Sequence, residues 1–116
     1  TSLDRSDLEA TGVDADPSDQ VLRLAALARE SGLDGVICSP LEIAALRKQC
    51  GPDFVLMVPG IRPVGSAAND QKRAMTPRQA VDLGATNLVV GRPIYQAADP
   101  RAAAEAIARE AGVNDL

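Results

Sequence analysis

The sequence contains no histidine and no tryptophan, and its only aromatic residues are Phe54 and Tyr95. Without histidine the chain cannot form a Ser-His-Asp triad, a histidine general base or a histidine metal site. With only two aromatic side chains it offers almost no surface on which nucleic-acid bases could stack. We therefore expect neither a metal site nor a nucleic-acid partner.

Lysine is scarce as well. The twelve cationic residues include only Lys48 and Lys72, and the others are arginines. The formal net charge is −4, whereas a protein that follows the phosphates of a duplex is usually basic. Arginine suits bidentate recognition of a phosphate group. The composition therefore argues against a nucleic-acid binder and leaves a small phosphorylated ligand open.

Long apolar runs and a cysteine framework are also missing. No apolar stretch approaches the roughly 18 residues of a membrane span, and no signal peptide is recognisable. Cys38 and Cys50 form no CxxC motif, so we expect two reduced thiols. These features predict a cytoplasmic protein that has no membrane partner.

What is present is the composition of one small globular domain. The chain has 116 residues, of which 46% are hydrophobic and 24% are charged. Such a chain can bury one core. It is too short for a complete (β/α)8 barrel, which needs about 250 residues.

Four helix starts share one signature, a capping residue followed by proline. They are Asp16-Pro17, Ser39-Pro40, Thr76-Pro77 and Asp99-Pro100. The spacings from Ser39 to Glu42 and from Thr76 to Gln79 predict two capping boxes. Glycines predict where the four helices end: Gly32, Gly51, Gly84 and Gly112.

Three short apolar runs, 35–38, 54–58 and 87–90, lie between these helices. They are continuously apolar, which is typical of strands that are buried on both faces of a helix-covered parallel sheet. Helices and strands alternate along the chain, and this order predicts right-handed βαβ units. We expect an α/β fold, either an open sheet or part of a (β/α)8 barrel.

Both architectures place ligands at the carboxyl ends of the strands, and polar residues follow the predicted strands in this sequence. Gly91-Arg92-Pro93 comes directly after the last apolar run. Glycine would let a ligand approach the backbone, and the arginine could hold a phosphate. The alternative is a tight turn with an arginine on the surface.

The long connection from Gly60 to Thr76 is a second candidate, because connections of this length are usually functional. It carries Arg62 near its start and the segment DQKR at 70–73. The amide of Gln71 could bridge a phosphate and a neutral polar group. The alternative is a solvated loop in which Asp70, Lys72 and Arg73 are ordinary surface charges.

No residue has a convincing catalytic setting. The carboxylates near the N-terminus are interpreted as helix caps and solvated charges. Lys48 lies late in a predicted helix, where a cation favours the helix dipole, and Lys72 has only Asp70 nearby. We expect ligand-binding residues in this chain but no catalytic residue.

Taken together, these motifs resemble one family. They are TSL at 1–3, LDGVICS at 33–39, VPGIRP at 58–63, DQKR at 70–73, TP at 76–77 and VGRPI at 90–94. Their order is similar to that in the second half of bacterial orotidine 5′-phosphate decarboxylases. The resemblance covers essentially the whole chain and runs from the end of barrel strand five to the C-terminal helix.

The resemblance implies a (β/α)8 barrel that works as a homodimer without a metal or an organic cofactor. It implies conversion of orotidine 5′-monophosphate to UMP and carbon dioxide in de novo pyrimidine synthesis. By the same resemblance Thr1 contacts the pyrimidine, and Arg62 and Gln71 contact the ligand from the connection after strand seven. Gly91 and Arg92 correspond to the phosphate-binding residues after strand eight.

One part of the family pattern is absent. The family's catalytic lysine and aspartates come from an Asp-x-Lys-x-x-Asp segment after strand three and from the first two strands, and no such segment occurs here. The resemblance therefore implies substrate contacts without catalysis in this chain, and a Thr1 that is not the natural start. Two alternatives stay open: a half-barrel that only binds phosphates or nucleotides, and a phosphosugar decarboxylase of the same superfamily.

Overall fold

The computed structural model describes residues 2–66 and 73–114. Its elements in chain order are α1 (Arg5–Ala10), α2 (Pro17–Glu30), β1 (Gly35–Ile37), the 3-10 helix η1 (Pro40–Glu42), α3 (Ile43–Cys50), β2 (Val55–Val58), α4 (Pro77–Leu83), β3 (Asn87–Leu88), α5 (Arg92–Tyr95) and α6 (Pro100–Glu110). The predicted alternation of helices and strands is confirmed. Two short helices, α1 and α5, were not predicted. Among the described helices, none has the length and apolar character needed to cross a membrane.

Two of the predicted helix caps form from local side chains. The Thr76 side chain accepts a hydrogen bond from the backbone of Gln79, and the Gln79 side chain completes the predicted capping box. The Asp99 carboxylate accepts from the backbone N–H of Ala102. The predicted glycines follow their helices with positive φ angles: Gly32, Gly51, Gly84 and Gly112. Local sequence therefore determines where these helices begin and end.

The other two caps do not form, because their side chains bind elsewhere. Asp16 precedes α2 without a side-chain cap, and its carboxylate accepts from Arg5 at 2.8 Å. The capping box predicted from Ser39 to Glu42 is wrong. Neither side chain caps η1, and both interact with Arg73 from the distant end of the long connection.

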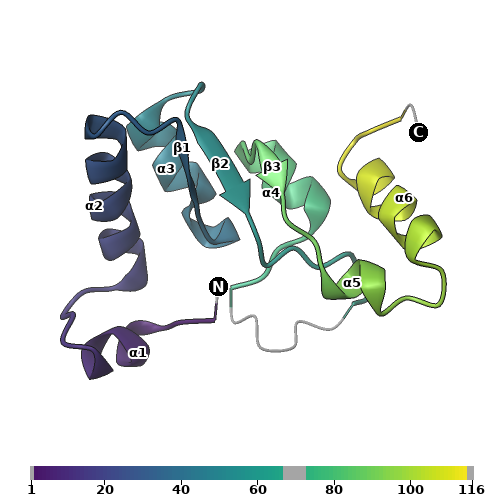
Figure 1. Cartoon of the computed structure of the whole chain (residues 1–116), viewed down its shortest axis with the longest axis horizontal. Coiled ribbons are helices and arrows are strands. Elements are labelled where there is room, and N and C mark those ends of the chain that lie inside the picture. The colour runs from purple at the N-terminus through teal and green to yellow at the C-terminus, as the bar shows by residue number, and fades with distance from the viewer. Residues whose placement is uncertain (1, 67–72, 115–116) are drawn as a thin grey trace.

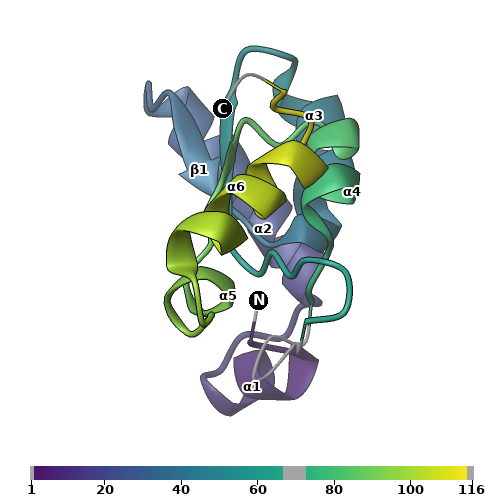
Figure 2. The ribbon, with the colours of Figure 1, turned by 90° about the vertical axis from the view of Figure 1, so that its right-hand side faces the viewer.

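The three strands form one parallel sheet in the order β1-β2-β3. Each strand is connected to the next strand in the sheet by a crossover that contains a helix. When all of these crossovers are right-handed, the helices lie on the same face of the sheet. Figures 1 and 2 show α3 and α4 together on one side of the sheet. A doubly wound open sheet would reverse its strand order and carry helices on both faces. Of the two predicted architectures, the described strands therefore follow the barrel.

The core lies between this helical layer and one face of the sheet. Leu56 and Val58 of β2 are fully buried there against Leu46 of α3 and Ala80 of α4. Ala25 of α2 belongs to the same cluster, so α2 packs on the same face as the two later helices.

The opposite face of the sheet is uncovered, and the prediction that the strands are buried on both faces is wrong for the described residues. Ile37 pairs with Met57, and Met57 pairs with Asn87, so the three lie in a row on this face. Ile37 is 71% exposed and Met57 is 37% exposed, and Val89, two residues beyond Asn87, is 45% exposed. Right-handed crossovers between neighbouring strands place the connecting helices on one face of the sheet. This explains why the described helices leave the opposite face uncovered.

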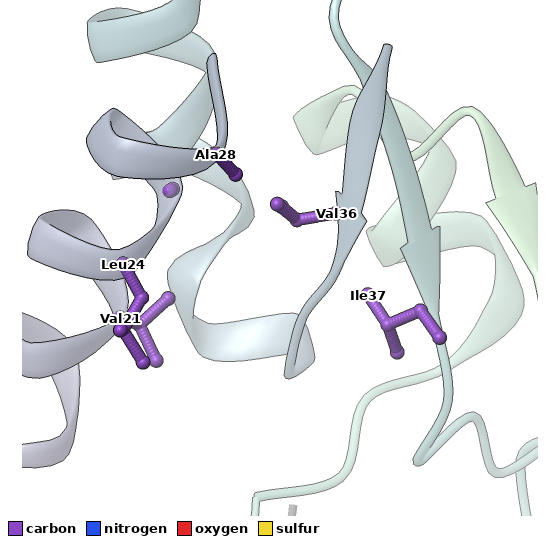
Figure 3. Close-up of a pocket in the computed structure, with 6 residues that line it drawn as sticks. Val21, Leu24, Ala28, Val36 and Ile37 are labelled. Carbon is purple, nitrogen blue, oxygen red and sulfur yellow. The ribbon is translucent and has the colours of Figure 1, made fainter. Parts of the chain in front are cut away.

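Strand β1 pairs only with β2 among the described strands, so its other edge has no strand beside it there. A pocket of about 370 Å³ lies between α2 and β1. In Figure 3, Val36 points from β1 toward α2. The pocket is lined by Val21, Leu24, Ala25, Ala28, Val36 and Ile37. Its apolar lining continues the apolar character of the uncovered face.

Candidate functional site

The carboxyl ends of the strands lie at one end of the sheet, and the segments that follow them meet there. Figure 1 shows the coloured part of the N-terminal segment, the first residues after β2 and helix α5 at this end. Because the strands are parallel neighbours, the segments after β2 and β3 emerge side by side. The structure thus brings Arg62 and the Gly91-Arg92 pair to the same end of the sheet.

Gly91 and Arg92 start the short helix α5. Gly91 is its N-cap, and the Gly91 carbonyl accepts from the backbone of Ile94 at 2.9 Å. A Cβ at position 91 would meet only the ring of Tyr95, at an ordinary contact distance of 3.5 Å. The space around Gly91 would therefore accept a Cβ, and a close approach of a ligand to the Gly91 backbone stays a prediction. Arg92 is half-buried, and its role as a ligand contact or as a surface arginine stays a prediction.

Arg62 lies at the base of the long connection and is buried. Its Nη1 donates to the carbonyl of Ile61 at 2.8 Å. Its backbone N–H donates to the carbonyl of Met75 at 2.9 Å, and Met75 donates in turn to the carbonyl of Gly60 at 3.2 Å. The two ends of the connection are thereby held together, and Arg62 sits where they join.

Two of the predicted ligand contacts, Thr1 and Gln71, lie outside the described residues, as do Asp70 and Lys72. Their predicted roles stay predictions. Of the predicted site residues, the structure describes Arg62, Gly91 and Arg92.

Cys38 is a nucleophilic side chain at this end of the sheet, because it directly follows β1. It is free and buried, as Cys50 is at the end of α3. Burial, with a smaller contribution from the negative charge of Glu42, raises the pKa of the Cys38 thiol to about 11. The thiol therefore stays protonated at neutral pH and is not an activated nucleophile.

The remaining candidates for chemistry lie elsewhere. Lys48 is exposed in the last turn of α3, and that helix runs from the carboxyl end of the sheet toward the amino end. Lys48 therefore lies at the opposite end from Arg62. Within residues 2–66 and 73–114, no group of three or more Cys, Asp or Glu side chains could hold a metal ion. Among the described residues, Arg62 and Arg92 are the cationic candidates for holding an anion at this end, and the described lysine, Lys48, is not beside them.

Sequence reasoning missed one buried charged pair next to this site. Arg73, interpreted in one alternative as an ordinary surface charge, is only 17% exposed at its side chain and pairs with the buried Glu42. Glu42 lies 31 residues earlier, so no local sequence spacing could predict the pair. The spacing from Ser39 to Glu42 instead predicted a capping box, which does not form.

Comparisons with known proteins agree on one family. The family model for the orotidine 5′-phosphate decarboxylase / HUMPS family matches residues 1–107. The orotidine 5′-phosphate decarboxylase of Pseudomonas putida (strain GB-1) is 56% identical over 110 residues, which cover 95% of this chain and 47% of that protein.

Solved structures give the same result. The crystal structure of orotidine 5′-phosphate decarboxylase from Lactobacillus acidophilus matches with a TM-score of 0.80 at 42% identity, over 97% of this chain and 46% of that one. The enzyme from Pyrococcus horikoshii OT3 matches with a TM-score of 0.63 at 31% identity, over 82% and 43% of the two chains. The fold is therefore that of the (β/α)8-barrel family, and the chain spans about half the length of the relatives it matches.

Proposed function

The chain belongs to the orotidine 5′-phosphate decarboxylase / HUMPS family, and from this premise we propose that it forms the phosphate-binding half of an orotidine 5′-phosphate decarboxylase. The complete enzyme would convert orotidine 5′-monophosphate and a proton to UMP and carbon dioxide in pyrimidine biosynthesis. Residues 1–116 would be the C-terminal half of the barrel. The observation that carries the proposal is that Arg62 and Gly91-Arg92 follow two neighbouring parallel strands, β2 and β3, and so belong to the same end of the sheet.

The division of labour follows from the side chains. The guanidinium groups of Arg62 and Arg92 would bind the phosphate dianion, and Gly91 would let the phosphate approach the backbone. Thr1 would contact the pyrimidine, and Gln71 would join the arginines. The binding energy of the phosphate would then hold the distant ring in place for reaction.

The proton donor and its neighbouring carboxylates would come from the other half of the barrel. The chain spans about half the length of the relatives it matches, which leaves the other half of the barrel to supply these groups. Family resemblance alone leads us to infer a cytoplasmic homodimer that needs no metal or organic cofactor.

An arginine substitution in the complete enzyme tests the proposal. Arg92→Ala should lower kcat/KM for orotidine 5′-monophosphate by about 30- to 1,000-fold, which corresponds to about 2–4 kcal/mol for a lost charge-assisted contact. Arg101→Ala is the matched control, because Arg101 is exposed on α6 and pairs only with Glu105 among the contacts found for it. Steady-state kinetics of both variants give the answer, and an unchanged kcat/KM in Arg92→Ala contradicts a phosphate role.

A second candidate concerns the 116 residues by themselves, because they span only about half the length of the relatives they match. On their own they would bind UMP without turnover. Calorimetry with UMP and with a pentose phosphate separates the possibilities. Preference for UMP supports the pyrimidine enzyme, and preference for the sugar phosphate supports a phosphosugar decarboxylase of the same superfamily.

A further inference from the structure

The end of the long connection is tied to the segment after β1 by buried polar contacts. Arg73 Nη1 donates to Glu42 Oε1. The hydroxyl of Ser39, which is also buried, donates to the backbone carbonyl of Arg73 at 3.4 Å. Side chain and main chain of Arg73 are therefore both held by residues 31 and 34 positions away.

The burial of Glu42 makes its contact with Arg73 important. Glu42 is 1% exposed, and a buried carboxylate is costly unless a cation or several donors compensate it. Its second oxygen, Oε2, is buried and has no hydrogen-bond partner in the described part of the chain. Arg73 is the cation that pairs with Glu42 in the described part of the chain, and a shift of Arg73 would leave this buried side chain without that partner.

Arg73 is connected to Arg62 through the backbone of Met75, which lies two residues after Arg73. Met75 forms a parallel bridge with Ile61, and its carbonyl accepts from the backbone N–H of Arg62 at 2.9 Å. Met75 also donates to the carbonyl of Gly60 at 3.2 Å. Fixing Arg73 therefore fixes the backbone from which the Arg62 guanidinium extends.

We propose that Glu42 is a positioning residue for phosphate binding, acting through its buried pair with Arg73 and the Ile61–Met75 bridge to set the place of Arg62. The inference rests on the proposed function. Glu42 touches no substrate in this scheme. Its carboxylate determines where the segment ending in Met75 lies, and that segment determines where Arg62 lies.

The experiment compares a ligand that has the phosphate with one that lacks it, in the complete enzyme. Glu42→Gln keeps the side-chain volume and removes the charge. The inhibition constant of UMP should rise about 10- to 100-fold, the scale for a binding group displaced by about 1 Å. The inhibition constant of uridine should stay within about twofold, because Arg62 has no phosphate to hold there.

Glu105→Gln is the control. Glu105 is a half-buried carboxylate on α6 that pairs with Arg101 at 3.0 Å and Arg109 at 3.4 Å. The ratio of the two inhibition constants should equal that of the wild type in this variant. If Glu42→Gln does not fold, Ser39→Ala removes the second tie and should raise the UMP constant alone by about 2- to 10-fold.

The outcomes separate the inference from its premise. Equal weakening of UMP and uridine, or a lower melting temperature with an unchanged ratio, would mean that Glu42 is merely structural and would overturn the inference. A wild-type enzyme that binds UMP and uridine equally would refute the proposed function, and the inference would fall with it. A selective loss of UMP affinity supports the inference.

Discussion

At the scale of single residues, Cys38 shows how burial decides whether a group near a site can react. The thiol follows β1 at the ligand-binding end, yet it is buried and close to the Glu42 carboxylate. Both factors disfavour the thiolate, and burial is the larger. Position near a site is therefore insufficient for chemistry when the ionised form cannot be solvated.

The shifted pKa of Cys38 predicts a pH dependence of stability. Its folded-state pKa, raised from 9.0 to about 11, exceeds the unfolded value, so the unfolded chain loses this proton first as pH rises. The stabilisation is complete below about pH 9 and is lost between about pH 9 and 11. Cys38→Ala should remove this component.

The measurement is the free energy of unfolding by urea at several pH values from 8 to about 11. All other titrating groups are common to the two proteins, so the difference between wild type and Cys38→Ala isolates the thiol. The advantage of the wild type should shrink as pH rises. A difference that does not change with pH would contradict the role assigned to burial.

Residues with local partners were predictable from sequence, and residues with distant partners were not. The Thr76–Gln79 capping box formed because the two side chains are three positions apart on the same helix. Ser39 and Glu42 have the same spacing, but Arg73 offers Glu42 a charged partner in a buried place. Desolvation makes that pairing more important than a cap at an exposed helix end.

At the scale of elements, Arg47 joins the amino ends of two strands on the side away from the candidate site. Its Nη1 donates to the carbonyls of Gly51 at 2.8 Å and Phe54 at 2.7 Å, just before β2. Its Nη2 donates to the carbonyl of Gly84 at 2.5 Å, just before β3. One side chain on α3 thereby fixes where β2 and β3 begin.

Removal of these donors should destabilise the fold. Arg47→Met keeps the apolar stem and should lower the free energy of unfolding by about 2–3 kcal/mol, because several carbonyls lose a charged donor. Arg101→Met, which loses an exposed pair with Glu105 on α6, should change it by less than about 1 kcal/mol. Denaturant titration compares the two. Equal effects would show that the Arg47 hydrogen bonds add nothing beyond an ordinary surface pair.

Gly35 determines how closely β1 and β2 approach. It pairs with Val55, and a Cβ on Gly35 would overlap the carbonyl oxygen and side chain of that residue. Gly35→Ala should therefore destabilise the sheet by about 2–4 kcal/mol, as overpacking of backbone against backbone does.

Gly32→Ala is the matched comparison for Gly35→Ala. Gly32 has a positive φ of 84° and open space around it, so alanine there should cost only about 1–2 kcal/mol of backbone strain. Thermal unfolding of both variants separates steric overlap from strain. A smaller loss in Gly35→Ala than in Gly32→Ala would contradict the close approach of the strands.

The longer helices and the strands could be predicted from the sequence, but the short helices α1 and α5 could not. Helices α2, α4 and α6 start at prolines, α3 follows the proline-started η1, and all four are followed by glycines; these signals act within one or two turns. Helix α1 has six residues and α5 has four, and neither is long enough to show an apolar face. Gly91 and Arg92 lie at the start of α5. The sequence therefore predicted these two residues as candidates but not the helical backbone that carries them.

At the scale of the whole molecule, the uncovered face of the sheet is the dominant feature. The same three strands that bury Leu56 on one face expose Ile37 and Met57 on the other. In a complete barrel the inward residues of a strand pack against those of the other strands. Continuously apolar runs are thus what strands of a complete barrel require. Among the described residues, however, only one face of these strands is covered.

This asymmetry predicts that one substitution has opposite effects in two settings. In the 116 residues alone, Ile37→Lys should leave the melting temperature nearly unchanged and reduce self-association, because Ile37 is 71% exposed and part of an apolar surface. In a polypeptide that carries a complete barrel, the same lysine would be buried without a partner. It should then lower the free energy of unfolding by more than about 3 kcal/mol.

Val81→Lys is the control for that comparison. Val81 is 37% exposed on α4, and α4 packs between α3 and α6, so its surroundings belong to the described chain. Its effect on stability should therefore be the same in both settings. Analytical ultracentrifugation and denaturant titration measure association and stability for both variants. If Ile37→Lys is equally tolerated with and without the remaining strands, the uncovered face does not become the barrel interior, and the assignment of this sheet to half a barrel core is wrong.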